Sequence, residues 1–412
     1  MSAPTNVAVA GVGYAGFSAA TPELGWKELM YSASTRAYRD AGVDPRRDVD
    51  SFLTCAEDYW EGFSIFDEFV PDQLGSVLRP TCTVTDDGIV GLGNAAMQIR
   101  TGEFDVVVVE AHSKASDLLT HEDVQLFAMD PVFSRPLTGP AERGERGEQW
   151  LPLSEAETPD DGPERVHPAF LAGLEMREYL ESSGTDERAA AAVAAKNKTN
   201  ALDNPLSTYG AEVTPDEVLA SEPVADPLRA LEMGQTADAS ITFVLMSEDV
   251  VEDYTDEYVW LEGFGWGSGT PWLSSRDTGA GYTSQAAEMA YDMAGVTEPR
   301  AEIDLAEVDD RYSFKELQHL EALGLAPEGR AGEWLEDGTF EPGGSLPVNV
   351  SGGSLGVGVL DEATGLQRSL EVVLQLRGDA GGRQVDDVSR GLAHSWRGVP
   401  TASGAVALFG GA

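Results

Sequence analysis

The stretch Ala37-Tyr-Arg-Asp-Ala-Gly-Val43 recurs as Ala290-Tyr-Asp-Met-Ala-Gly-Val296 in the second part of the chain. Each copy ends an alanine-rich stretch, and its glycine stands where the C-cap of a helix belongs, because glycine adopts the left-handed conformation without strain. The repeat therefore predicts two helices that end in the same way.

The flanks of the two copies are also similar. An apolar run that ends in glycines precedes each copy, Val7-Ala-Val-Ala-Gly-Val-Gly13 in the first case and Tyr258-Val-Trp-Leu-Glu-Gly-Phe-Gly265 in the second. A short strand-like segment follows each copy, at residues 48–53 and 302–308. Strand, helix and strand form a βαβ unit, so we expect an α/β protein built from two similar βαβ-rich halves.

Each half contains a second helix signal that begins at glycines. In the first half, residues 87–102 are small or apolar on all sides, which favours a helix packed on every face. The uncharged run Val106-Val-Val-Val109 follows it and predicts a strand buried on both faces. In the second half, the glycine-rich turn at residues 352–358 leads into a predicted helix at residues 363–376.

A chain of 412 residues exceeds the size at which a single hydrophobic core keeps growing, so two domains of about 150 to 250 residues are expected. We place the N-terminal half at residues 1–250 and the C-terminal half at residues 256–412. A loop or cover region at about 115–190 belongs to the first half, because residues 136–163 are rich in Gly, Pro, Glu and Asp without apolar periodicity.

The start of the chain predicts a cytoplasmic location. The segment after Met1 enters directly into an apolar strand and lacks the basic start and long apolar stretch of a signal peptide. No apolar run approaches the ~20 residues needed to cross a bilayer, so we expect no membrane insertion.

The net charge of −44 comes from 71 acidic and 27 basic residues, and the acidic residues are scattered along the whole chain. Such a surface indicates adaptation to high salt, where repulsion is screened over about 3 Å at 1 M, and it argues against nucleic-acid binding. Lysine is almost absent, with only five copies: Lys27, Lys114, Lys196, Lys198 and Lys315.

The two cysteines, Cys55 and Cys82, fit neither a disulfide framework nor a metal site, because no Cys-x-x-Cys motif or histidine cluster accompanies them. We expect both to be buried free thiols, and we expect no metal site.

Several motifs together resemble the thiolase superfamily, in particular its archaeal and sterol-carrier-type branch. Gly102-Glu-Phe-Asp-Val resembles the family's strand entry, and residues 195–205 resemble its Lys-Asn…Asn-Ala…Asn-Pro segment. Residues 343–353 resemble a segment in the C-terminal half of the family's proteins, and Gly391-Leu-Ala-His-Ser-Trp-Arg-Gly398 resembles the family's last active-site loop. The resemblance extends over nearly the whole chain.

This resemblance implies a five-layered α-β-α-β-α arrangement in which each half buries one helix and the catalytic loops meet at the N-termini of those helices. It implies acyl-CoA thioesters as substrates or ligands and no tightly bound cofactor. It also implies a homodimer or a dimer of dimers, and a possible small zinc-ribbon/OB-fold partner protein.

The position of the family's nucleophilic cysteine is occupied here by Thr85, and Cys82 lies three residues too early to replace it. A threonine hydroxyl is a weak nucleophile that needs a strong neighbouring base, for which Asp86, Asp87 and Asp309 are candidates. The alternative is structural: Thr85 or one of the two following aspartates caps a buried helix.

The family's two histidine motifs are altered as well. Asp309-Asp-Arg-Tyr312 matches His-Asp-x-Phe, so Asp309 replaces the histidine, and Tyr312 offers a hydroxyl for proton transfer or simply packs. Residues 358–360 match Gly-His-Pro, so apolar Val359 replaces the base. His394 persists near the last loop, either as a catalytic or as a hydrogen-bonded structural histidine.

Backbone N–H groups do not depend on side chains, so an oxyanion pocket at a helix N-terminus is still expected, formed at Gly88 and near Gly398. By resemblance, six residues are expected to contact the substrate: Gly88, Asn349, Gly352, Gly353, Gly358 and Gly398.

Three functions are compatible with these observations. The chain is an acyl-CoA C-acyltransferase of the thiolase type with an altered active site, or a non-catalytic acyl-CoA- or lipid-binding scaffold subunit of a thiolase–OB-fold complex, or a thiolase-fold acyl-CoA retro-aldolase. The substitutions at Thr85, Asp309 and Val359 argue against ordinary thiolysis, and the fold alone does not decide among the three.

Overall fold

The computed structural model describes residues 5–56, 66–117, 168–270, 278–399 and 401–412. Of the loop or cover region predicted at about 115–190, residues 118–167 lie outside these ranges, including the Gly-, Pro- and acid-rich part at 136–163. The described end of the region is helical and not a loop, since α6 spans Pro168–Ser183 and the next helix begins at Glu187. Within the described ranges, none of the helices combines the length and the apolar character needed to cross a bilayer.

The two halves have sheets of the same topology. In the N-terminal half the strand order is β3-β2-β4-β7-β1, with bounds β1 Val7–Ser18, β2 Ser51–Cys55, β3 Thr81–Val84, β4 Val106–Lys114 and β7 Asp238–Ser247. In the C-terminal half the order is β9-β10-β11-β8, with bounds β8 Val259–Ser268, β9 Leu305–Glu307, β10 Arg390–Arg397 and β11 Ser403–Gly411. Corresponding pairs are parallel or antiparallel in the same way.

Even the edge strand of the first sheet has a counterpart, because Val348 forms a single parallel bridge with Ala306 of β9 as β3 pairs with β2. The two sheets join where β1 pairs with β8 over two residues, Ala8 and Val9. The βαβ repeat predicted from the sequence is thus confirmed.

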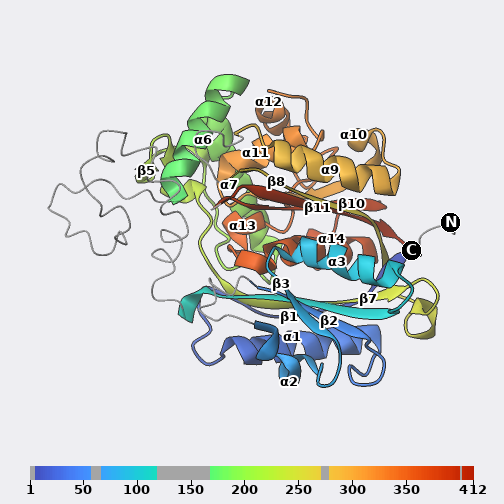
Figure 1. Cartoon of the computed structure of the whole chain (residues 1–412). Coiled ribbons are helices and arrows are strands. Elements are labelled where there is room, and N and C mark those ends of the chain that lie inside the picture. Colours follow the sequence, from blue (N-terminus) through green and yellow to red (C-terminus); the bar gives the residue numbers. More distant parts are fainter. Residues whose placement is uncertain (1–4, 57–65, 118–167, 271–277, 400) are drawn as a thin grey trace, which may run out of the picture.

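The elements stack in five layers (Figure 1). Helices α1 (Trp26–Ala41) and α2 (Pro71–Leu74) cover the outer face of the first sheet. Between the two sheets lie α3 (Gly88–Arg100), α13 (Gly353–Gly356) and α14 (Thr364–Arg377). The outer face of the second sheet carries α9 (Gly281–Ala294), α10 (Pro299–Glu302), α11 (Ser313–Ala322) and α12 (Ala331–Glu336). This is the expected α-β-α-β-α arrangement.

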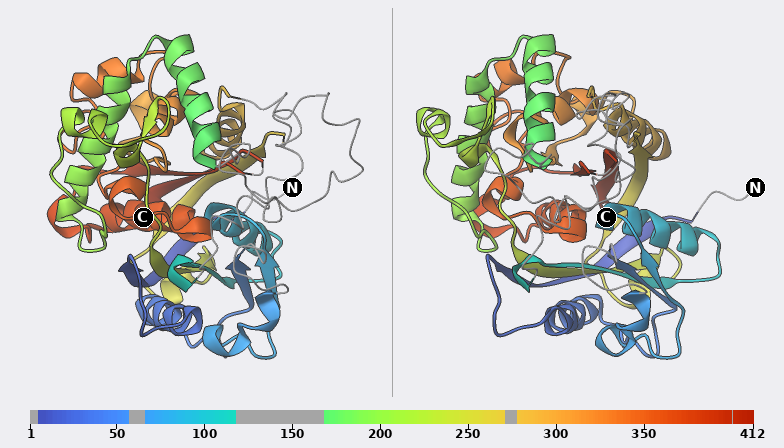
Figure 2. Two further views of the ribbon diagram at one scale, coloured as in Figure 1. Left: turned by 90° about the vertical axis from the view of Figure 1, so that its left-hand side faces the viewer. Right: turned by 60° about the vertical axis from the view of Figure 1, so that its left-hand side comes forward.

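Helices α6 (Pro168–Ser183) and α7 (Glu187–Asn200), which precede β7 in the chain, pack against α11 and α12 of the C-terminal half (Figure 2). The short helix α8 (Pro215–Leu219) and the hairpin of β5 (Pro223–Ala225) and β6 (Leu228–Arg229) complete this part. It forms one side of the C-terminal half.

Small residues explain why the repeated sequence forms the repeated packing. A Cβ atom on Gly13 of β1 would lie 2.2 Å from the carbonyl oxygen of Ala33 in α1. A Cβ atom on Gly263 of β8 would lie equally close, 2.2 Å, to the carbonyl oxygen of Ala290 in α9. Both helices therefore touch their strands backbone to backbone, and both end at a left-handed glycine, Gly42 and Gly295, as predicted.

The cysteine prediction is half confirmed. Cys55 in β2 is buried, but Cys82 in β3 is exposed, which corrects the expectation that both thiols are buried. The reason is the strand order: β3 is the outermost strand of the first sheet, and its place at the edge is set by the topology rather than by its own sequence.

Candidate active site

The N-termini of the two buried helices meet at one carboxylate, that of Asp87. It caps α3 by accepting a hydrogen bond from the N–H of Ile89 at 2.9 Å, and it accepts another from the N–H of Gly365 in α14, also at 2.9 Å. The hydroxyl of Ser395 in β10 donates a third at 2.6 Å. Of the three residues expected as possible caps, Thr85, Asp86 and Asp87, it is Asp87 that caps the helix.

Burial raises the pKa of Asp87 to about 6, against the opposing effect of its three hydrogen-bond donors. The carboxylate therefore holds or releases a proton near neutral pH, and it sits at the positive ends of two helices. A group with this property in a recess between two elements is a candidate for general acid–base chemistry.

A cavity of about 30 Å³ opens beside Asp87. Its lining comes from both halves and consists mainly of charged side chains: Asp87, Arg311, Asp361, Glu362, Trp396, Arg397 and Val399. Arg397 forms an ion pair with Asp86 at 3.0 Å, and burial lowers the pKa of Arg397 to about 10. The cavity thus presents acids and cations side by side.

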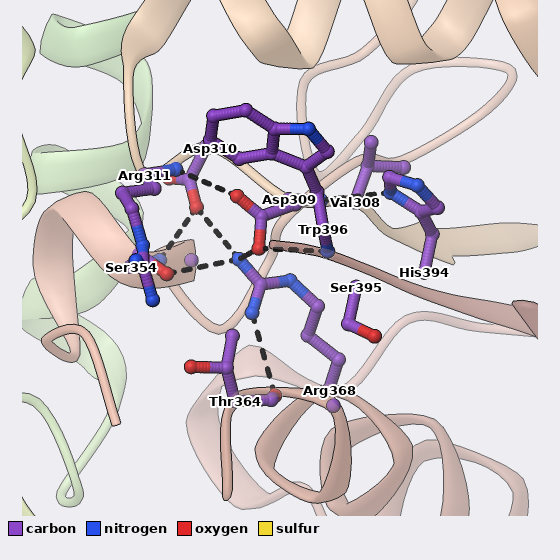
Figure 3. A network of polar contacts seen from close by, with 12 residues as sticks. Val308, Asp309, Asp310, Arg311, Ser354, Thr364, Arg368, His394, Ser395 and Trp396 are labelled. Carbon is purple, nitrogen blue, oxygen red and sulfur yellow. Dashed lines mark hydrogen bonds and ion pairs between the residues drawn. The ribbon is translucent and has the colours of Figure 1, made fainter. Parts of the chain in front are cut away.

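Figure 3 shows a buried ionic network centred on Arg368. The guanidinium of Arg368, on α14, lies 3.4 Å from the Asp309 carboxylate and 3.1 Å from the Asp310 carboxylate. It also donates to the Ser354 hydroxyl at 2.9 Å. All four side chains are fully buried.

Backbone groups complete the network. Asp309 accepts hydrogen bonds from the N–H groups of Arg311 at 3.0 Å and of Trp396 at 3.3 Å. Asp310 accepts from the N–H of Ser354 at 2.6 Å and from the Asn197 side chain at 2.8 Å. Burial raises the pKa of Asp310 to about 6, and the nearby Arg368 opposes that rise. The network ties the β9–α11 loop to α7, α13 and α14.

The predicted catalytic residue Asp309 is therefore part of an ion pair and does not line the cavity. His394 is also buried away from the cavity. Its Nδ1 accepts from the N–H of Asp309 at 3.3 Å, so its Nε2 carries the proton and donates to Thr283 Oγ1 at 3.1 Å. Burial lowers the pKa of His394 to about 3, which keeps the ring neutral.

The two predicted hydroxyl groups lie in opposite environments. Thr85 is exposed in the turn between β3 and α3. Tyr312 is buried against Trp396, with ring centroids 6.1 Å apart, and burial raises its pKa to about 12. Neither is among the residues that line the cavity. Their catalytic roles stay predictions.

Most predicted substrate contacts occupy tight structural positions. Gly88 begins α3, where a Cβ atom would lie 2.3 Å from the Leu366 side chain of α14. Asn349 accepts from the N–H of Val308 at 2.7 Å and donates to Glu316 at 2.6 Å. The four other predicted positions are also buried within the fold: Gly352, Gly353, Gly358 and Gly398. Of the six, none is among the residues that line the cavity.

Sequence reasoning missed the arginines of the site. Arg368 and Glu371 are the two charged residues of the predicted helical stretch from Leu366 to Leu376, and their presence in a helix expected to be buried was the available signal. Arg311 stands at the variable position of the altered second motif, Asp309-Asp-Arg-Tyr312, so the resemblance assigns it no role.

Comparison with known proteins identifies the family. Residues 271–410 match the family model described as "Thiolase C-terminal domain-like". An acetyl-CoA acetyltransferase of Methanothermobacter thermautotrophicus is 31% identical over 95% of this chain and 96% of its own length. Sterol carrier protein 2 of Oryctolagus cuniculus is 33% identical over 56% of this chain and 43% of its own.

A solved structure named "Ltp2-ChsH2(DUF35) aldolase" superimposes with a TM-score of 0.78 at 24% identity, and it covers 99% of this chain and 98% of the other. That likeness shows the common fold. The sequence relatives establish that the chain belongs to the thiolase superfamily, in the branch of archaeal acetyl-CoA acetyltransferases and sterol carrier protein 2.

Proposed function

We propose that this chain binds an acyl-CoA thioester at the helix junction and breaks a carbon–carbon bond in it by acid–base chemistry, as a retro-aldolase. The observation that carries the proposal is Asp87, a carboxylate with a pKa of about 6 that lines the cavity where the two helix N-termini meet. The family supplies the thioester class, and the likeness to a structure named as an aldolase agrees with the reaction.

The positions of the thiols argue against an acyl-enzyme route. Cys55 is buried against α3, since a Cβ atom on Gly91 would lie 2.3 Å from its sulfur, and burial raises its thiol pKa well above the usual range. Cys82 lies on the exposed edge strand. Neither sulfur lines the cavity, so neither is placed to attack a thioester bound beside Asp87.

In the proposed reaction, the Asp87 carboxylate accepts the proton of a 3-hydroxyl group on the acyl chain. The C2–C3 bond breaks, C3 becomes a carbonyl carbon, and the bonding electrons form the thioester enolate. The enolate oxygen is stabilised by the positive helix ends, and the proton held by Asp87 then returns to C2, which gives a shorter acyl-CoA. Atoms and electrons balance without an added oxidant or reductant.

The test uses the purified protein in concentrated salt, alone and with its candidate OB-fold partner, on 3-hydroxyacyl-CoA and 3-ketoacyl-CoA thioesters. We expect a carbonyl product from the hydroxy thioesters, and a loss of roughly 100-fold or more in Asp87→Asn. Because the base must be ionised, the rate falls as pH drops through about 6. Asp72→Asn, an exposed aspartate remote from the cavity, is the matched control.

The acyltransferase reaction of the family makes a different prediction in the same assay. Transfer through Thr85 would require that 3-ketoacyl-CoA acylates the hydroxyl with release of acetyl-CoA and that free CoA then takes the acyl group from the enzyme, and turnover would be lost in Thr85→Ala. Tyr312→Phe tests the phenol in the same way. Activity that depends on Thr85 and not on Asp87 would contradict the retro-aldol proposal.

A non-catalytic scaffold subunit is the second candidate, and one observation favours it. Asp87 receives three hydrogen bonds within the chain and Asp309 is neutralised by Arg368, so both carboxylates already have structural partners. Saturable acyl-CoA binding without turnover, with and without the partner protein, would support this candidate against the enzyme.

We also propose that the chain assembles as a homodimer or dimer of dimers, with a small zinc-ribbon/OB-fold protein, in a cytoplasm of high salt. The name of the superimposed aldolase, Ltp2-ChsH2(DUF35), joins two components, which agrees with a two-protein complex. Light scattering of the chain with and without the partner, at high and low salt, measures both assemblies.

A further inference from the structure

The cavity beside Asp87 contains an arginine that has no anionic partner among the described residues. Arg311 lines this cavity, and in this part of the chain no carboxylate forms an ion pair with it. Its side-chain Nε is buried without a hydrogen-bond partner. An uncompensated charge at a partly buried position costs free energy, so its presence calls for an explanation.

The backbone of Arg311 is held firmly on both sides. Its N–H donates to Asp309 at 3.0 Å, and its carbonyl oxygen accepts from the N–H of Gly234 at 2.8 Å. The side chain therefore starts from a fixed point at the cavity wall. Only the side-chain rotamers of Arg311 are then left to be ordered when a ligand binds.

The carboxylates nearest in the chain are already engaged. Asp309 and Asp310 share the guanidinium of Arg368, and the other cavity arginine, Arg397, pairs with Asp86. Asp361 and Glu362 also line the cavity, but neither forms an ion pair with Arg311 among the described residues. Arg311 is thus left as a cation available to a ligand, in a chain where acids outnumber basic residues by 71 to 27.

The size of the cavity indicates what the ligand group is. A volume of about 30 Å³ has room for about two water molecules, which corresponds to the two oxygens of one carboxylate group. The planar guanidinium fork matches a carboxylate in a bidentate manner. Asp87 lines the same small cavity, so the bound group lies close to the proposed reacting atoms.

We propose that the acyl part of the thioester carries a carboxylate on C3, next to the bond that breaks, and that Arg311 binds this carboxylate. The proposal rests on the retro-aldol function and names its substrate class. The 3-hydroxyl proton passes to Asp87, the C2–C3 bond breaks, and C3 leaves as the carbonyl carbon of a 2-oxo acid. The enolate takes the proton back at C2 to give the shorter acyl-CoA.

The test compares two thioesters of equal length by equilibrium binding, which requires no turnover. One is 3-hydroxybutanoyl-CoA, and the other has a carboxylate in place of its C4 methyl group. We expect the wild type to prefer the carboxylate ligand, and Arg311→Gln to weaken that ligand roughly 10- to 100-fold while leaving the methyl ligand nearly unchanged. Arg311→Lys should keep part of the preference.

Arg39→Gln is the matched control, since Arg39 is an exposed arginine on α1, remote from the cavity. It should weaken neither ligand, and its thermal unfolding should match that of the Arg311 variants. If Arg311→Gln weakened the binding of both ligands equally, the proposal would be overturned, because Arg311 would then bind a group that both ligands share. Absence of any preference in the wild type would overturn it as well.

The same ligands separate this inference from the proposed function. Preference for the carboxylate without cleavage would contradict the retro-aldol reaction but not the recognition by Arg311. Cleavage of both thioesters with equal efficiency would contradict the recognition of the carboxylate by Arg311, but not the retro-aldol reaction.

Discussion

The N-terminal and C-terminal halves bring the same elements to the helix junction but supply different charges there. The first half contributes Asp87, one carboxylate that caps its own helix and also binds the other. The second half contributes Arg368 with Asp309 and Asp310, all fully buried. The shared topology therefore constrains where side chains meet, while each half determines its own electrostatics.

The largest effect is expected from removing the cation of the C-terminal half. Arg368→Met leaves Asp309 and Asp310 buried without their counter-charge, which should destabilise the protein by about 3 to 5 kcal/mol. Chemical unfolding in concentrated salt measures this loss.

A double variant separates the lost charge from lost packing. Arg368→Met combined with Asp310→Asn leaves fewer uncompensated charges and should recover part of the stability. A loss below about 1 kcal/mol in the single variant would show that the network is not the main charge compensation of this half.

The next effect is the pH dependence that Asp87 gives to the N-terminal half. Because burial raises its pKa from 3.8 to about 6, ionisation costs folding free energy, and this cost is absent below about pH 4 and complete above about pH 6. The stability of the wild type should therefore fall relative to Asp87→Asn across this window, by at most about 3 kcal/mol.

Parallel urea or guanidinium titrations of the two proteins from pH 4 to pH 7 test this sign. A difference that grows in favour of the wild type as pH rises would mean that the helix N-termini lower the pKa of Asp87 more than burial raises it.

The equivalence of the two halves is tested by a matched pair of glycine variants. Gly13→Ala and Gly263→Ala each place a Cβ atom 2.2 Å from a helix carbonyl oxygen, in α1 and α9 respectively. Both should cost about 1 to 3 kcal/mol, since the helix must move away from its strand. Gly343→Ala, where a Cβ atom would meet nothing within 4 Å, is the control. Very unequal costs in thermal unfolding would show that the halves pack differently.

These contrasts also show which parts could be predicted from sequence. The strands, the helix ends at Gly42 and Gly295 and the βαβ repeat depend on local patterns of small and apolar residues, and the structure confirms them. The pairing of Arg368 with Asp309 joins residues far apart in the chain, so no local pattern indicated it.

The same limit applies to individual side chains. Thr85 and Asp309 were selected by their place in a motif, but the structure puts one on the surface and the other in an ion pair, since exposure is decided by tertiary packing. Cys82 was expected to be buried because cysteines usually are, and its edge position depends on the strand order of the whole sheet.

The smallest effect concerns the rim of the cavity, where Asp86 and Arg397 form an ion pair with about a quarter of each side chain exposed. Such a pair contributes about 0 to 1 kcal/mol and is screened by salt, so Asp86→Asn should change stability little, and less at high salt than at low salt.

The buried network around Arg368 is shielded from ions, so the cost of Arg368→Met should hardly change with salt. Unfolding of both variants at low and high salt therefore compares rim and interior directly. An equal salt dependence would mean that solvent ions reach the network, in contrast to the full burial of its side chains.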